Sequence, residues 1–212
     1  MRDVDSAFLT ALQNARERGI VPRKLISITG RDFETGDPAL VSFWSGHEDV
    51  TMTVVSGISG ATSSRLFVGS VNLTVSPIPR VADLTIQTVT VSVSQIAEPI
   101  QALVRGLDVR LAKVEIWEAL LDPTSRQLVS TPPLVFLGEV DGSPITTPEV
   151  GGEGSVEISV VSDAISMLTR KNPQKSSYEA QKLRSPNPAD PDQFGKYAAS
   201  IRSWSIPWGV KD

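Results

Sequence analysis

The sequence predicts a mostly β protein built from barrel-like, curved antiparallel sheets, with an N-terminal helix, one or two short helices and an extended C-terminal arm. Short β-rich segments bounded by turn residues recur from residue 25 onward. In the two longest segments, the alternation of apolar residues changes phase. The composition, with 40% hydrophobic and 21% charged residues, is ordinary for a globular protein. We therefore expect a helix at 1–20, a β-barrel-like region of one or more domains at 21–170 and an arm at 171–212.

The first element is predicted as an amphipathic helix. Val4, Phe8 and Leu12 recur at i+4 spacing, which places them on one helical face. Candidate N-terminal caps are Asp3, Asp5 and Ser6. Gly19 stands where a left-handed C-terminal cap is expected. The helix should cover a sheet of its own chain or dock on a neighbouring subunit.

Strands are predicted wherever Val, Ile and Thr gather between Gly, Asp, Ser or Pro. The predicted strands are residues 25–28, 40–44, 50–55, 66–68, 71–75, 84–94, 108–119, 134–138 and 156–161. Shorter features are a helix at 98–105 that stops at Gly106, a turn at 122–125, a loop at 142–154 and a short helix at 163–168.

Two of these strands break the strict alternation of a flat strand. In 84–94 the apolar positions shift phase near Gln87 and Thr88, and in 108–119 they shift between Leu111 and Val114. Alternation with a period of two cannot slip by one residue without turning the other face inward. Each shift therefore predicts a bulge or sharp bend, which is typical of curved sheets and barrels.

The C-terminal arm changes character along its length. Residues 171–196 are polar and contain four prolines, whereas the last residues return to large apolar groups. These apolar residues are Tyr197, Ile201, Trp204, Ile206 and Trp208. Because exposed aromatic side chains favour association, we expect the end of the arm to dock either on its own barrel or on an adjacent subunit.

Charge and composition exclude several classes of protein. The net charge is −4 and the 20 basic residues are scattered, which argues against nucleic acid as the main partner. The absence of cysteine excludes disulfides, thiolate metal sites and iron–sulfur ligation. No apolar run is long enough to span a bilayer, and residues 1–5 lack the apolar core of a signal peptide. We expect a soluble protein that is assembled in a cytoplasm.

Catalytic chemistry finds little support in the sequence. His47 is the sole histidine, and with Glu48 and Asp49 it could form half a metal site or an acid/base pair; a loop histidine is the favoured interpretation. No G-x-S-x-G elbow is present. Three other acidic or glycine-rich segments could bind a ligand, but each has a simpler interpretation. Asp32, Glu34 and Asp37 are interpreted as a solvated hairpin and 151–154 as a flexible turn. Asp190 and Asp192 are interpreted as part of a linker. We predict no catalytic, cofactor-binding or metal-binding residue.

Six residues are predicted at subunit interfaces. Arg105, Asp108 and Arg110 flank a helix-to-strand junction, where a charge network could bridge subunits or form a plain intrachain salt bridge. The other three are the aromatic residues of the arm, Tyr197, Trp204 and Trp208.

Several short motifs resemble those of small tail-tip proteins of bacteriophages. The segment 105–112 reads RGLDVRLA, 114–117 reads VEIW and 136–142 reads FLGEVDG, and these follow a strand and a short helix in the order found in that group. Matching positions also occur at 161–162, at 168–170, and at the end, where Gln181, Arg184, Asp192 and Phe194 precede Trp208-Gly209. Together they extend over roughly residues 43–209. The chain thus resembles the baseplate hub proteins of siphophages and gene transfer agents.

The resemblance implies β-barrel-like domains that oligomerise into a tube continuing the tail channel. Several members of the group carry a C-terminal cysteine cluster for an iron–sulfur centre; this chain has no cysteine, so it would be a shortened hub without a cofactor. The implied location is the virion tail tip, assembled in the host cytoplasm, and the implied role is structural and not enzymatic.

The implied partners are sister copies in a closed ring, with a trimer favoured over a hexamer, and the neighbouring tail-tube, distal tail and tail-tip proteins. DNA would be met only in transit through the channel, and this chain would not anchor in a membrane. Three alternatives stay open: a distal tail protein forming a hexameric ring, a receptor- or carbohydrate-binding β-module, and a peptidoglycan hydrolase. The last would need paired carboxylates, with Glu48, Asp49, Glu115 and Glu118 as its candidates.

Overall fold

The computed structural model describes residues 5–79, 85–142, 145–146, 154–169, 177–184, 187, 189, 192–197, 200–205 and 209. The chain divides into two compact units, Met1–Leu168 and Thr169–Asp212. Strands account for 44% of the structure and helices for 19%. The predicted mostly β class is therefore confirmed.

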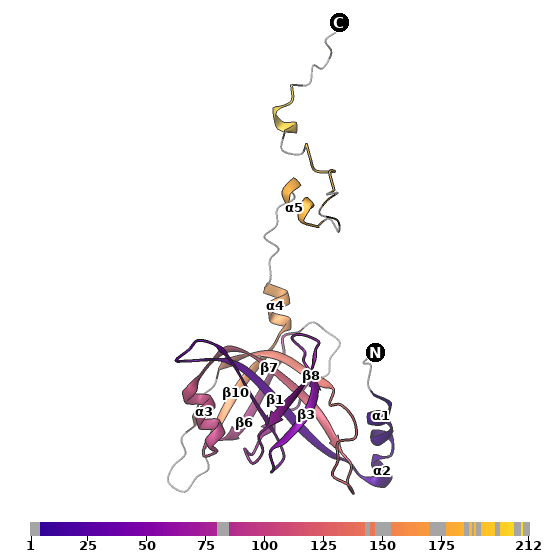
Figure 1. Cartoon of the computed structure of the whole chain (residues 1–212), viewed down its shortest axis with the longest axis vertical. Helices are drawn as coiled ribbons and strands as arrows, with labels where there is room; N and C mark the ends of the chain where they lie inside the picture. Colours follow the sequence, from indigo (N-terminus) through magenta and orange to yellow (C-terminus); the bar gives the residue numbers. More distant parts are fainter. Residues whose placement is uncertain are drawn as a thin grey trace. The chain divides into compact units, whose positions relative to one another are not determined.

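The first unit is an antiparallel sheet that curls into a half-barrel (Figure 1). Its strands, in the described part of the chain, are β1 (Val21–Asp32), β2 (Pro38–Trp44), β3 (Val50–Val55), β4 (Thr62–Phe67), β5 (Thr74–Val75), β6 (Thr88–Ser94), β7 (Leu107–Leu121), β8 (Leu134–Gly142), β9 (Ile145–Thr146) and β10 (Ser155–Ser162). Eight of them form one sheet in the order β2-β1-β7-β8-β10-β6-β5, with β9 paired to β10. The hairpin β3–β4 forms a separate two-stranded sheet.

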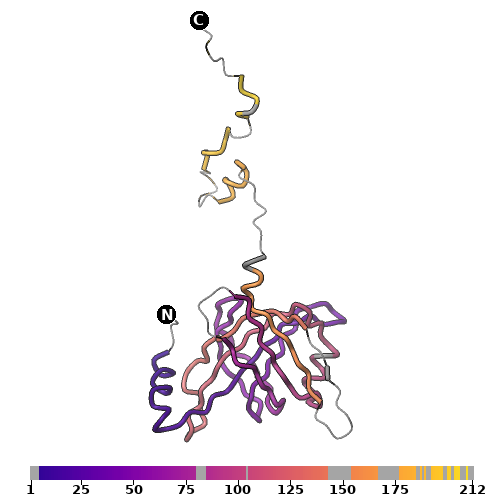
Figure 2. The backbone as a smooth tube through the Cα atoms, turned by 180° about the vertical axis from the view of Figure 1, so that it is seen from behind, coloured from indigo at the N-terminus to yellow at the C-terminus, as the bar shows by residue number. Residues whose placement is uncertain are grey.

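Short helices flank the half-barrel. They are α1 (Ser6–Gln13), α2 (Ala15–Arg18), α3 (Glu98–Gly106) and α4 (Ala164–Thr169). The predicted N-terminal helix is confirmed, although Asn14 divides it in two: Asp5 Oδ1 accepts the N–H of Ala7 at 2.7 Å, and Gly19 ends α2 at φ +76°. In Figures 1 and 2, α1 and α2 lie on the opposite side of the half-barrel from α3.

The long central strand β7 is buried on both faces. Val114 and Ile116 face the larger hydrophobic cluster of the half-barrel, which includes Ile26 and Ile28 of β1. Trp117 and Ala119 face a second cluster, which includes Met52, Val54 and Phe67 of the β3–β4 hairpin. Full burial of one such aliphatic or aromatic side chain contributes about 1.5–3 kcal/mol, so both clusters depend on β7. Side chains pack the hairpin on the sheet, and directly after β4 the backbone of Val68 is hydrogen-bonded to Ser42 and Trp44 of β2.

The phase shift predicted in β7 is a real irregularity. Thr29 of β1 pairs with Lys113, whereas Arg31 pairs with Asp108, so a longer stretch of β7 faces a shorter stretch of β1. Within that stretch Leu111 has φ +55° and a 71% exposed side chain. The apolar residue that broke the pattern is therefore turned to the surface by a bulge.

The other predicted bulge is wrong. Strand β6 begins only at Thr88, residues 85–87 are outside any strand, and 80–84 lie outside the described residues. The phase shift near Gln87 therefore marks the beginning of the strand. The predicted strand at 71–75 is likewise shorter, because only Thr74–Val75 pairs, although Val71 and Leu73 are buried. Within the predicted loop at 142–154, Ile145–Thr146 forms the short strand β9.

The second unit contains two short helices that the sequence did not predict. They are α5 (Tyr178–Arg184) and the 3₁₀ helix η1 (Ile201–Ser203). The α5 helix has no buried residue, and Gln181 donates to Asp192 Oδ2 at 2.8 Å. Among the described helices, none combines the length and apolarity required to cross a membrane.

Candidate functional site

A buried carboxylate joins the β3–β4 hairpin to the main sheet. Glu115 of β7 is 1% exposed. Its Oε1 accepts hydrogen bonds from Ser56 Oγ at 2.9 Å and from the N–H of Gly57 at 2.6 Å, and its Oε2 accepts one from Arg65 Nη1 at 2.6 Å. Ser56 and Gly57 lie in the hairpin turn and Arg65 lies on β4, so three points of the hairpin converge on one side chain.

Aromatic side chains complete this cluster. The Arg65 guanidinium lies 5.1 Å from the centroid of the Trp117 ring, and Phe67 meets the same ring edge-on at 6.1 Å. The indole N–H of Trp117 donates to the Val55 carbonyl at 2.9 Å. Both carboxylate oxygens of Glu115 are occupied by donors, so this cluster acts as a structural anchor for the hairpin.

The four carboxylates considered for hydrolysis lie in three different surroundings. Glu115 is enclosed in the anchor, whereas Glu118 forms a partly exposed ion pair with Lys24 at 3.0 Å. Glu48 and Asp49 lie in the loop before β3, and both are exposed. The Glu115 carboxylate is thus held by its own chain and is not presented to solvent.

The loop with His47, Glu48 and Asp49 forms part of a groove of about 860 Å³. Other walls come from Arg23 at the start of β1, from β3, and from the segment 121–131. Asp49 Oδ1 accepts the N–H of Gly69 at 3.0 Å, and the carbonyl of Glu48 accepts the Trp44 indole N–H at 2.6 Å. Within the described part of the chain, no three His, Cys, Asp or Glu side chains gather as metal ligands. His47 is exposed in this loop, as the favoured interpretation expected.

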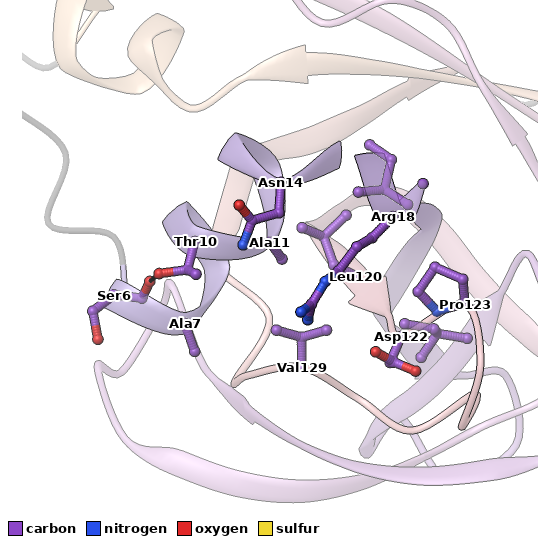
Figure 3. Close-up of a pocket in the computed structure, with 13 residues that line it drawn as sticks. Ser6, Ala7, Thr10, Ala11, Asn14, Arg18, Leu120, Asp122, Pro123 and Val129 are labelled. Atoms are coloured by element: carbon purple, nitrogen blue, oxygen red, sulfur yellow. Dashed lines mark hydrogen bonds between the residues drawn. The ribbon is translucent and has the colours of Figure 1, made fainter. Parts of the chain in front are cut away.

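A second, smaller pocket of about 350 Å³ lies on the other side of the same segment (Figure 3). The helices α1 and α2 form one wall, with Thr10 and Asn14, and the end of β7 with its turn forms the other. Arg18 extends into the space between these walls in Figure 3. Backbone hydrogen bonds from Ser125 and Thr124 lower the pKa of Asp122, with a small contribution from the Arg18 charge. The turn predicted at 122–125 is thereby confirmed.

At the α3–β7 junction the structure shows a plain intrachain salt bridge, which was one of the two predicted alternatives. Arg110 Nη2 lies 2.6 Å from Asp108 Oδ2, and Arg110 Nε donates to Asp108 Oδ1 at 2.9 Å. The side-chain hydrogen bond from Arg110 is the main cause that lowers the pKa of Asp108 to about 2. Arg105 is exposed and is not bonded to either residue in the described structure. The structure thus shows an intrachain salt bridge; the interface role of these residues stays a prediction.

Two of the three predicted aromatic interface residues are described. Tyr197 and Trp204 are 57% and 55% exposed, and their ring centroids lie 6.1 Å apart at an interplanar angle of 49°. Trp208 lies outside the described residues, as do 151–153 and Asp190. The acidic hairpin 32–37 is a turn: Asp32 Oδ1 accepts the N–H of Glu34 and of Thr35, which lowers the Asp32 pKa, with Thr35 the larger cause.

Sequence reasoning missed the anchor and the arginines of the groove. Arg65 carried a detectable signal: in β4, residues 63, 65 and 67 alternate inward while Leu66 is 57% exposed. An arginine at an inward strand position predicts a buried partner of opposite charge. Arg23 and Arg126 carried no such signal, because their proximity depends on the folding of β1 against the end of β7.

Comparison with known proteins does not identify a family. No family model matches the chain, and no curated protein matches it significantly.

Proposed function

We propose that this chain is a structural component of the tail tip of a long-tailed bacteriophage, a shortened baseplate hub that works as one copy in a closed ring. The observation that supports this most is a curled sheet whose described strands end with β2 at one edge and β5 at the other. Among the described residues, Val68 bonds the β2 edge at Ser42 and Trp44, and the rest of that edge has no strand paired to it. Exposed sheet edges are prone to pair with another chain. Sister copies arranged around an axis would cover such edges and form a continuous wall.

The arm supports the same proposal. The second unit exposes large apolar side chains, including Phe194 at 94%, Tyr197 at 57% and Trp204 at 55%. The rings of Tyr197 and Trp204 lie 6.1 Å apart, and exposed apolar side chains that gather on a surface are typical of an interaction site. The proposed partners are sister subunits first, and the adjoining tail-tube, distal tail and tail-tip proteins second, with DNA passing through the channel. The motifs at 105–117 and 136–142 support the tail-tip assignment.

The proposed role is not enzymatic. Glu115, the buried carboxylate of the candidate set, has both oxygens occupied by donors of its own chain, and Glu118 is paired with Lys24. We expect purified protein to release no fragments from peptidoglycan. Activity that disappears in a Glu48→Gln, Asp49→Asn variant would contradict the proposal.

The mass of the assembled protein in solution tests the proposal. We expect three copies of the 22.8 kDa chain, measured by light scattering and native mass spectrometry. Six copies would favour the distal tail protein, and a monomer that binds glycans would favour the receptor-binding module. A particle in which labelled protein is absent from the tail tip would overturn the assignment.

A further inference from the structure

The side chain of Lys113 is held by two carboxylates from different elements. Lys113 lies on β7, and its Nζ is 2.7 Å from Oε1 of Glu139, the residue directly opposite it on β8. The same Nζ donates to Asp163 Oδ1 at 2.6 Å. Asp163 lies between the end of β10 and the start of α4. One ammonium group therefore joins the start of α4 to two strands of the half-barrel.

The backbone around Asp163 lies against β8. The N–H of Asp163 donates to the Leu137 carbonyl at 3.0 Å, and the carbonyl of Asp163 accepts the N–H of Ser166 at 3.0 Å. Close by, Gly138 of β8 approaches the end of β10 so tightly that a Cβ there would clash with the Val161 carbonyl oxygen. The start of α4 is therefore held at one defined place on the half-barrel.

The α4 helix is short and weakly packed at its start. It has six residues, whereas an isolated helix of fewer than about 12–15 residues is marginally stable at best. Ala164 and Ile165 are half-buried, and neither belongs to the two hydrophobic clusters of the half-barrel. The helical conformation of α4 should therefore depend strongly on the contacts of Asp163.

The ion pairs of Lys113 are suited to open without unfolding the half-barrel. The side chains of Lys113, Glu139 and Asp163 are 37%, 25% and 26% exposed. Ion pairs that reach solvent contribute little to global stability and are weakened by salt. Without the ammonium group, the two carboxylates would face each other and repel. Loss of the lysine charge should therefore act locally, on the start of α4.

We propose that Lys113 is an ionic latch, a positioning residue that holds the start of α4 on the half-barrel and lets α4 unwind when its ion pairs break. The first unit ends at Leu168 and the second begins at Thr169, so the latch fixes the last helix before the arm. In its consequence for the arm, the inference rests on the proposed function. A closed latch leaves less chain entropy to lose when the arm docks on a sister copy.

Amide hydrogen exchange in the full chain, followed by NMR, tests the latch. Lys113→Met keeps an aliphatic stem and removes the charge. We expect exchange at least tenfold faster at the amides of Asp163 and Ser166, whose hydrogen bonds hold the start of α4. Lys24→Met is the matched control, because Lys24 forms a similarly exposed pair with Glu118 at 3.0 Å. That control should leave exchange at Asp163 and Ser166 unchanged.

A merely structural role of Lys113 predicts a different result. Equal acceleration at Asp163 and at the Ile116 amide in the middle of β7 would overturn the latch, as would unchanged exchange at Asp163. The double variant Lys113→Glu, Asp163→Lys keeps one ammonium group between two carboxylates. It should therefore restore exchange at Ser166 to within threefold of the wild-type rate.

The unaltered protein supplies a readout that does not depend on the folding of a variant. Raising the NaCl concentration from about 0.05 M to about 1 M screens partly exposed ion pairs. Exchange at Asp163 and Ser166 should then become at least threefold faster relative to Ile116. Exchange at Asp163 that does not respond to salt would overturn the latch.

The dissociation constant of the assembled ring measures the consequence for the arm. Lys113→Met should raise this constant at least threefold, measured by light scattering on dilution, and Lys24→Met should leave it unchanged. An unchanged constant in Lys113→Met protein with fast exchange at Asp163 would overturn the link between the latch and assembly. A wild-type chain that stays monomeric would instead contradict the proposed function, and the exchange rates would still decide whether the latch exists.

Discussion

Arg65 Nη1 lies 2.6 Å from Glu115 Oε2, and this ion pair joins two sheets that share no continuous backbone ladder. Arg65 is on the separate β3–β4 hairpin and Glu115 is on the central strand of the half-barrel. The side chains are 10% and 1% exposed. Because water cannot replace a lost partner at such depth, the pair makes the position of the hairpin sensitive to a single substitution.

Glu115→Gln should lower the free energy of unfolding by about 3–5 kcal/mol, because it leaves the Arg65 charge buried without a counter-charge. Chemical denaturation measures the change. Glu118→Gln is the matched control, since it removes a partly exposed pair with Lys24 and should cost about 1 kcal/mol or less. Equal losses of stability in the Glu115→Gln and Glu118→Gln variants would contradict the role of Glu115 as an anchor of the hairpin. The variant with both Arg65→Met and Glu115→Gln should cost less than the sum of the single changes.

Leu111 should tolerate glycine better than a β-branched residue. Its φ of +55° costs an L-residue about 1–2 kcal/mol, which exceeds the entropy lost by glycine, about 0.5–1 kcal/mol. The side chain is 71% exposed, so little burial is lost. Leu111→Gly should raise the free energy of unfolding by up to about 1 kcal/mol and Leu111→Val should lower it. The reverse order in thermal unfolding would show that the bulge is absent in solution.

The ionised Asp108 carboxylate should stabilise the folded protein, and this contribution should be lost at low pH. Its hydrogen-bonded Arg110 lowers its pKa from 3.8 to about 2. A carboxyl group whose pKa falls on folding contributes stability above its unfolded pKa and loses it as the pH falls through the folded pKa. The difference in stability between the wild type and Asp108→Asn should therefore shrink as the pH falls from about 5 to about 2. Carbon NMR titration of the Asp108 carboxyl checks the pKa directly; an ordinary value would refute the prediction.

Gly69 is a close-approach position. A Cβ there would lie 2.6 Å from the Glu48 carbonyl oxygen and 2.7 Å from the His47 carbonyl carbon, both backbone atoms. Gly69→Ala should therefore displace the loop that lines the groove and lower the free energy of unfolding by about 1–3 kcal/mol. At Gly142 a Cβ meets no atom of the described residues within 4 Å, so Gly142→Ala should change stability little. An unchanged free energy of unfolding in the Gly69→Ala variant would mean that the loop shifts to accommodate the added methyl group without cost.

The exposed aromatic pair of the arm should support assembly. Replacing Tyr197 and Trp204 with serine together should shift the measured mass toward the single chain, if the proposed ring depends on the arm, and should leave the thermal unfolding of the half-barrel unchanged. Ile58→Ser, which alters an apolar side chain that is 52% exposed outside the arm, is the control. An unchanged mass in the double variant would exclude these two residues from the interface.

Local patterns explain which features could be predicted. The caps at Asp5 and Gly19, the turn at Asp122 and the bulge near Leu111 each follow from a few neighbouring residues, because φ limits and short-range hydrogen bonds act within a turn of chain. The wrong bulge near Gln87 has the same origin. A phase shift looks identical whether a strand bends or only begins there, and pairing with a distant strand decides between them.

The sequence by itself determined the mostly β class, the terminal helix and the absence of cysteine chemistry, because composition and period-two alternation depend on neighbouring residues alone. Only the tertiary structure decided that Glu115 is enclosed by Arg65 and not free for chemistry, and that Arg23 and Arg126 line one groove with strand β3. These pairings join residues far apart in the chain. Their cause is the packing of the hairpin and of β1 against β7, which no local pattern encodes.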